Sequence, residues 1–148
     1  MTVENQLRGV IWIPLSVTVL ILSLLFLPAV REFNRFDPQT FPVAAVDWLE
    51  RNPQSGRMFN YFPWGGYLLY RLYPEYRVFI DGQTDFYGEA LTREYETVIT
   101  VAPGWEQVLA RYAVNWVIIP AEQPLGQALR QAGWQEIYRD AAAVILRR

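Results

Sequence analysis

Three carboxylates stand close together near the middle of the chain, Asp81, Asp85 and Glu89, in the segment DGQTDFYGE. They follow an apolar run, 76–80, that is typical of a strand, and open α/β sheets usually hold ligands at that end of a strand. Carboxylate oxygens bind hard cations such as calcium, although this spacing departs from the known twelve-residue calcium loop. The alternative is structural, because Asp-Gly forms turns and an aspartate side chain can accept bonds from backbone donors of its own loop.

Three arginines, Arg57, Arg71 and Arg77, are near enough in sequence to neutralise these acids, so an ion-pair cluster would explain the same residues without a ligand. We favour that structural interpretation. The chain contains no His and no Cys, which removes the commonest general base, the usual Ser and Cys triads and nearly all zinc sites. We therefore assign no catalytic residue, no metal and no cofactor.

The segment 59–88 is unusually aromatic, with eleven aromatic residues in thirty positions. Rings stacked on sugar faces, with amides and carboxylates bonded to hydroxyls, would form a carbohydrate or polyprenyl-sugar site, and two glycines opening a helix after a strand could receive an anion on their N–H groups. Alternatively, the rings fill a core or lie at a membrane interface, and the glycines permit a tight turn. Besides the three carboxylates, the candidate ligand-binding residues are Asn60, Trp64, Gly65, Gly66 and Tyr67.

A run of twenty-two residues without a charge, 9–30, lies between Arg8 and Arg31. As a helix it would be about 33 Å long, enough to cross the hydrocarbon core of a bilayer. The alternatives are a buried core helix, which is usually shorter, and a cleaved signal peptide, whose cleavage pattern the segment 28–30 fits poorly. We expect a stub over 1–8, then a retained single-pass transmembrane helix in contact with the lipid bilayer.

The orientation of this anchor is not decided by the flanking arginines, which are few on both sides. A short N-terminal stub usually stays inside, so we expect the C-terminal domain on the extracytoplasmic side of the cell membrane. The net charge of the chain is −2, which argues against a nucleic-acid partner.

After a polar linker over 31–40, residues 41–148 are enough for one small domain with one core. Apolar periodicity and turn residues predict an α/β fold with a mixed, mainly parallel sheet of about five strands that ends in an antiparallel hairpin. The expected helices cover 41–51, 65–73, a segment from 89, a segment after 104, and 124–131; the expected strands cover 57–62, 76–80, 115–119, 134–139 and 142–146.

Five motifs of the chain are familiar together: W-L-x-x-N-P, FNYFPWGGYLLYRLYP, YRVFIDGQTDFYG, W-x-x-V-L-x-x-Y-x-V-N-W-V-I-I and GW-x-x-x-Y-x-D. From 41 to 148, with a membrane helix before it, the sequence resembles the C-terminal extracytoplasmic domain of bacterial polytopic membrane proteins related to the C-type, polyprenyl-phosphate-sugar-dependent glycosyltransferases. In such transferases the catalytic acid lies in a loop between the first membrane helices. This chain has no such set of many membrane helices, so the resemblance implies a split or truncated gene product or a free-standing accessory subunit.

Two functions remain as hypotheses. The preferred one is a non-catalytic, membrane-tethered domain that assists a polytopic glycosyltransferase-like membrane protein through its aromatic segment and its anchor. The alternative is a small sugar-binding or metal-assisted enzymatic domain that uses Asp81, Asp85 and Glu89.

Overall fold

In a computed structural model of the chain, residues 14–23 and 36–148 are described, apart from the side chains of residues 84–86. The chain divides into two compact units, residues 1–36 and 37–148. The expected limits of the stub, the linker and the domain stay predictions.

In the first unit, residues 14–23 form a helix whose side chains are all exposed. The hydroxyls of Thr18 and Ser23 donate to the carbonyl oxygens of Pro14 and Val19, each four residues earlier, at 2.8 Å. Within the described residues, 14–23 and 36–148, no helix is both long and apolar enough to cross a membrane. The rest of the predicted span, 9–13 and 24–30, lies outside them.

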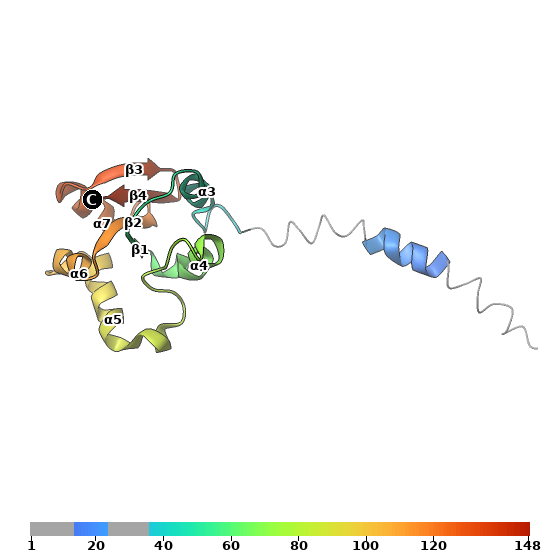
Figure 1. Cartoon of the computed structure of the whole chain (residues 1–148), viewed down its shortest axis with the longest axis horizontal. Coiled ribbons are helices and arrows are strands. Elements are labelled where there is room, and N and C mark those ends of the chain that lie inside the picture. The colour runs from blue at the N-terminus through green and yellow to red at the C-terminus, as the bar shows by residue number, and fades with distance from the viewer. Residues whose placement is uncertain (1–13, 24–35) are drawn as a thin grey trace, which may run out of the picture. The chain divides into compact units, whose positions relative to one another are not determined.

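The second unit is an α/β domain, and most predicted helices are confirmed within a few residues (Figure 1). Proline or glycine precedes α3, α6 and the 3₁₀ turn η1 or occupies their first positions, where a missing donor or a left-handed residue costs little. The elements are α3 (Val43–Arg51), β1 (Arg57–Asn60), η1 (Phe62–Trp64), α4 (Gly65–Leu72), α5 (Thr84–Ile99), α6 (Trp105–Arg111), β2 (Val114–Pro120), α7 (Pro124–Gln131), β3 (Gln135–Arg139) and β4 (Ala143–Arg147).

The sheet of the described domain has four strands in the order β1-β2-β4-β3, not five. β1 pairs with β2 in parallel, whereas β2 with β4 and β3 with β4 pair antiparallel. The final hairpin is therefore confirmed, but the expectation of a mainly parallel sheet is wrong because a single pair of strands is parallel.

The missing strand is the predicted one over 76–80. Its amides do not join a ladder: the side-chain Oδ1 of Asn60 accepts the backbone N–H of Phe79 at 2.7 Å, and Asn60 Nδ2 donates to the carbonyl of Ile80 at 2.9 Å. One buried amide side chain at the end of β1 thus bonds to residues 79 and 80 at the place where a fifth strand was expected.

Helices cover both faces of the sheet, and β2 is buried between them. Trp116 and Ile118 of β2 pack with α3 and α4, whereas Val117 and Ile119 pack with α5, α6 and α7. This division follows from the alternation of side chains along a strand, which sends successive residues to opposite faces. A strand covered in this way has an almost continuous apolar sequence, as residues 115–119 predicted.

Three helices end with a residue in the left-handed region of the backbone map. Val101 (φ 57°), Ala113 (φ 51°) and Gly133 (φ 87°) follow α5, α6 and α7. After α7, the amides of Gly133 and Trp134 donate to the carbonyls of Arg130 and Leu129, which is the usual glycine-terminated helix end. Ala113 and Val101 occupy the same position without glycine's freedom.

Candidate functional site

Asn60, the first candidate, is completely buried at the end of β1. Its Nδ2 donates to the carbonyls of Ile80 and Tyr61, and its Oδ1 accepts from the amides of Phe79 and Ile80. Both donors and the acceptor oxygen are therefore bonded to the main chain. In the structure this amide holds the segment 79–80 against β1.

The two glycines of α4 have opposite environments. Gly65 is buried, and a Cβ atom there would lie 2.3 Å from the carbonyl oxygen of Ile80 and 2.6 Å from Asp81 Cα; Gly66 is exposed, with nothing within 4 Å of a Cβ. The helical path already starts at η1, so the amide of Gly65 donates to the carbonyl of Phe62. This N–H group is therefore used inside the protein, and Gly65 serves the close approach of two main-chain segments.

Trp64, at the end of η1, and Tyr67, in α4, both contact residues at the start of the domain. Trp64 is buried, and its indole Nε1 donates to the carbonyl of Thr40 at 2.9 Å. Tyr67 is also buried, and its ring lies 5.2 Å from that of Phe41. These two aromatic side chains therefore attach α4 to residues 40–41.

Asp81 is 5% exposed, directly after the segment that Asn60 holds. Its Oδ1 accepts the backbone N–H of Gln83 at 2.9 Å, the aspartate turn that the Asp-Gly sequence indicated. Desolvation raises the pKa of Tyr87, and the neighbouring negative charge of Asp81 raises it further. Asp81 is thus buried in a turn and near a phenol.

Glu89 lies on the exposed surface of α5, one residue after Gly88, whose φ of 72° interrupts the helix. It pairs with Arg93, one turn further, at 3.5 Å, and its side chain is 90% exposed. The side chain of Asp85 lies outside the described residues. Among the side chains that are described, no three carboxylates are placed to share a metal ion, and a ligand role for Asp81, Asp85 and Glu89 stays a prediction.

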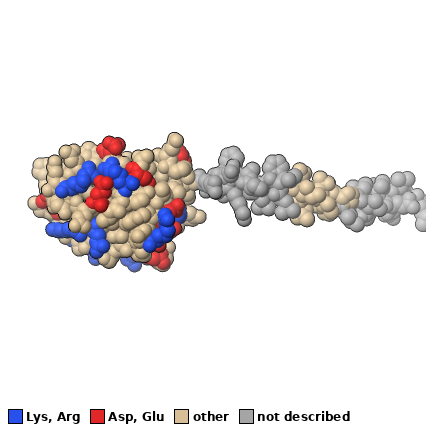
Figure 2. Space-filling model, turned by 90° about the horizontal axis from the view of Figure 1, so that it is seen from above, with Lys and Arg blue, Asp and Glu red and all other residues tan. Residues whose placement is uncertain are grey.

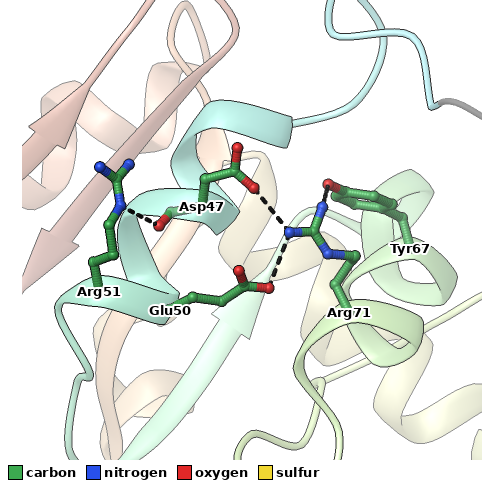
Figure 3. A network of polar contacts seen from close by, with 5 residues as sticks. All are labelled: Asp47, Glu50, Arg51, Tyr67 and Arg71. Carbon is green, nitrogen blue, oxygen red and sulfur yellow. Dashed lines mark hydrogen bonds and ion pairs between the residues drawn. The ribbon is translucent and has the colours of Figure 1, made fainter.

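The expected ion pairs between these acids and nearby arginines are wrong for Arg71. Its Nη2 donates to Asp47 Oδ1 at 2.8 Å and to Glu50 Oε1 at 2.9 Å, both on α3, and its Nη1 donates to the hydroxyl of Tyr67 at 2.9 Å (Figure 3). Desolvation lowers the pKa of Arg71, but the hydrogen bonds to both carboxylates outweigh it and the pKa is raised. Arg71 therefore joins α3 to α4.

Arg57 also has another partner than the acids of the candidate site. Its Nη1 donates to the backbone carbonyl of Tyr112 at 3.3 Å, and its own amide donates to Asn115 Oδ1. These contacts join β1 to the turn before β2 and to β2 itself.

Much of the aromatic segment is core. Phe59 is fully buried and stacks on Tyr95 of α5, with 5.5 Å between ring centroids. The Tyr95 hydroxyl accepts the amide of Phe62, and burial raises the pKa of Tyr95 to about 12. The interpretation of these rings as core is thereby supported for Phe59, while Tyr61, Phe62 and Phe79 pack against the same core partly buried.

Two tyrosines that the sequence analysis did not single out behave differently. Tyr70 and Tyr73 are 75% and 64% exposed, on the outer side of α4 and at its end. The sequence contains a signal for an uncharged side of a helix here, because positions 63, 66, 70 and 73 repeat at helical spacing and none of them is charged.

The described surface offers few other features for a ligand. A hollow of about 400 Å³ is lined by residues 38–39, 43–44 and 140–142, and one of about 100 Å³ lies beside Trp105 and Trp134; no candidate residue lines either of them. On the face of the domain in Figure 2, basic and acidic side chains lie next to one another, so this face has no extended patch of one sign.

Comparison with known proteins adds no assignment: no protein-family model and no curated protein matches the chain. The resemblance to glycosyltransferase-related membrane proteins therefore stays a proposal.

Proposed function

We propose that this protein is a non-catalytic, single-pass membrane protein whose α/β domain lies on the extracytoplasmic side of a bacterial membrane and assists a polytopic glycosyltransferase-like protein. The observation that carries the proposal is the uncharged run of twenty-two residues, 9–30, ahead of the domain. Such a run is long enough to span the hydrocarbon core of a bilayer.

The described part of that run supports a lipid environment. Its large apolar side chains, among them Leu20 at 60% exposed, lie on the outside of the described helix. The hydroxyls of Thr18 and Ser23 bond to carbonyls of their own helix, which meets the requirement that polar groups inside a bilayer be satisfied within the protein. In water the same surface would be an unfavourable apolar patch.

An accessory role is supported by how the polar candidates of the domain are used. The amide of Asn60, the carboxylate of Asp81 and the indole of Trp64 all bond to the main chain of the domain itself. A residue that holds the fold cannot rearrange freely around a substrate without exposing unpaired buried groups. These residues therefore favour a scaffold over a reacting site.

The partner is proposed from the sequence motifs that resemble the C-terminal domain of glycosyltransferase-related proteins. In the proposed assembly, the anchor helix packs among the membrane helices of the partner. The α/β domain then takes the place of a C-terminal domain that the partner itself lacks. The chemistry then belongs to the partner.

The proposal is tested by co-expression with the product of an adjoining gene that encodes about ten apolar spans. After extraction in a mild detergent, the full chain should copurify with that product. A matched chain in which residues 9–30 are replaced by an unrelated membrane helix should stay in the membrane but lose the partner.

Two results would contradict the proposal. One is a full chain that purifies from the membrane without the polytopic product. The other is a calcium-dependent rise in the melting temperature that Asp81→Asn abolishes, because a ligand that binds the native state stabilises it. The second result would favour the alternative function at the carboxylates.

A further inference from the structure

The outer side of α4 carries no charge. Its exposed residues, together with those of η1 and the residues just after α4, are Pro63, Gly66, Tyr70, Tyr73 and Pro74. Because 63, 66, 70 and 73 are separated by three, four and three residues, they form one stripe along the helical path. Tyr70 and Tyr73 are the exposed large apolar residues of the described domain, 37–148.

The one charged residue of α4 is turned away from this stripe. Arg71 reaches Asp47 and Glu50 on α3 and bonds to the hydroxyl of Tyr67 (Figure 3). The network pairs the guanidinium with two carboxylates of α3 and keeps it off the outer side. Charged residues resume only at Glu75, beyond the end of the helix.

The stripe also lies beside the point at which the chain enters the domain. Trp64 Nε1 bonds to the carbonyl of Thr40, and Tyr67 packs on Phe41, so α4 rests on residues 40–41 (Figure 1). Ten residues, 31–40, separate the apolar run from this point, a reach of at most about 35 Å. With the proposed anchor in the bilayer, this length sets the greatest distance that the entry point can lie from the bilayer surface.

We propose that the stripe Pro63, Gly66, Tyr70, Tyr73 and Pro74 lies on the lipid headgroup region of the membrane that holds the anchor. The inference rests on the proposed membrane tether. Tyrosine rings are enriched at this depth because their body is apolar and their hydroxyl stays hydrated. The side of an eight-residue helix, about 12 Å long, is too small for a stable protein interface of about 1,000 Å². A tethered surface needs less area because its effective concentration at the bilayer is high.

The absence of Cys makes the test direct. The full chain is reconstituted in phosphatidylcholine vesicles with one nitroxide label at a time, on Gly66→Cys, Gln127→Cys or Leu20→Cys. Position 66 has open space around a Cβ, Gln127 is exposed on α7 in the opposite helix layer, and Leu20 reports on the anchor. Collision rates are measured with oxygen, which concentrates in lipid, and with a water-soluble nickel chelate.

The label at 66 should collide more with oxygen and less with the nickel chelate than the label at 127. High salt should not change this result, because the stripe is uncharged. Tyr70→Ser with Tyr73→Ser should abolish this difference while the label at 20 stays in lipid. Equal nickel accessibility at 66 and 127, with 20 in lipid, would overturn the inference alone. Shielding of 66 from both reagents would indicate a protein contact and also overturn it. Nickel accessibility at 20 would overturn the tether, and the inference with it.

Discussion

Gly65 lies against the main chain of Asp81, with only 2.6 Å between the position of a Cβ at 65 and Asp81 Cα. The two residues come from different segments, the start of α4 and the turn after residue 80. Of the two interpretations of the glycine pair, an anion site or a tight local path of the main chain, this close approach supports the second for Gly65. At this place the structure has a packing contact between two segments of the main chain.

This contact predicts opposite effects for neighbouring glycines. Gly65→Ala should lower the free energy of unfolding by at least about 2 kcal/mol, because the added methyl would overlap the Ile80 carbonyl and the backbone must move. Gly66→Ala, in open space, should raise it by up to about 1 kcal/mol through helix propensity. Urea denaturation of the domain 37–148 measures both. Equal effects of the two substitutions would contradict the packing.

Substitution of Asn60 should cause a second large loss of stability. Asn60→Ala removes the acceptor of the Phe79 amide and the donor to the Ile80 carbonyl, and each unsatisfied buried group costs about 1–3 kcal/mol. The matched control is Asn52→Ala, whose exposed amide bonds to the carbonyl of Trp48 at the end of α3. The urea midpoint of Asn60→Ala should lie clearly below that of Asn52→Ala. A midpoint for Asn60→Ala close to that of the parent would argue against the structural role.

Tyr95 predicts a loss of stability at alkaline pH. Burial raises its pKa in the folded state to about 12 from the ordinary value of 10.0. The folded state thus keeps the proton while the unfolded state releases it, so the stabilisation is complete below pH 10 and is lost as the pH rises towards 12. Each pKa unit corresponds to about 1.4 kcal/mol, so a pKa difference of about two makes the loss on the order of 3 kcal/mol.

Tyr95→Phe isolates this contribution. The variant should be less stable at neutral pH by about 1 kcal/mol, because the Phe62 amide loses its acceptor. Its stability should then fall less steeply than that of the parent between pH 9 and 12, measured by urea midpoints at each pH. Parallel curves for parent and variant would exclude Tyr95 as the group responsible.

The helix ends predict that glycine is favoured at 113. Ala113 has a φ of 51° after α6, and the left-handed region costs a residue with a Cβ about 1–2 kcal/mol. Ala113→Gly should therefore raise the melting temperature, and Gly133→Ala, in open space with a φ of 87°, should lower it for the same reason. If both changes shift the melting temperature in one direction, backbone strain does not explain these positions.

Much of the fold was predictable because its signals are local. Proline and glycine at 103–104 precede α6, Gly133 follows α7, and the tight connection at 140–141 allows only a hairpin. The nearly continuous apolar run over 115–119 likewise indicated a strand covered on both faces.

The fifth strand and the ion pairs could not be predicted in the same way because their partners are distant in sequence. Residues 76–80 have the composition of a strand, but the Asn60 side chain, about twenty residues away, bonds to the main chain of residues 79 and 80, and the Tyr76 amide donates to the carbonyl of Leu72. Arg71 likewise bonds to carboxylates on α3, more than twenty residues earlier, and not to the acids that follow it. The sequence therefore indicated that Arg71 forms ion pairs but not which carboxylates it binds.

Extraction of membranes with alkaline carbonate tests whether residues 9–30 attach the chain to the bilayer. The full chain should stay in the pellet after carbonate and after high salt, because an apolar helix that spans the bilayer is not held by surface charge. Leu20→Arg with Leu22→Arg should move it to the soluble fraction, since each arginine at the centre of a span costs about 2.5–3.5 kcal/mol on insertion. The same two arginines at the exposed positions Gln107 and Gln127 should leave it in the pellet. Release of the parent chain by carbonate would contradict the account.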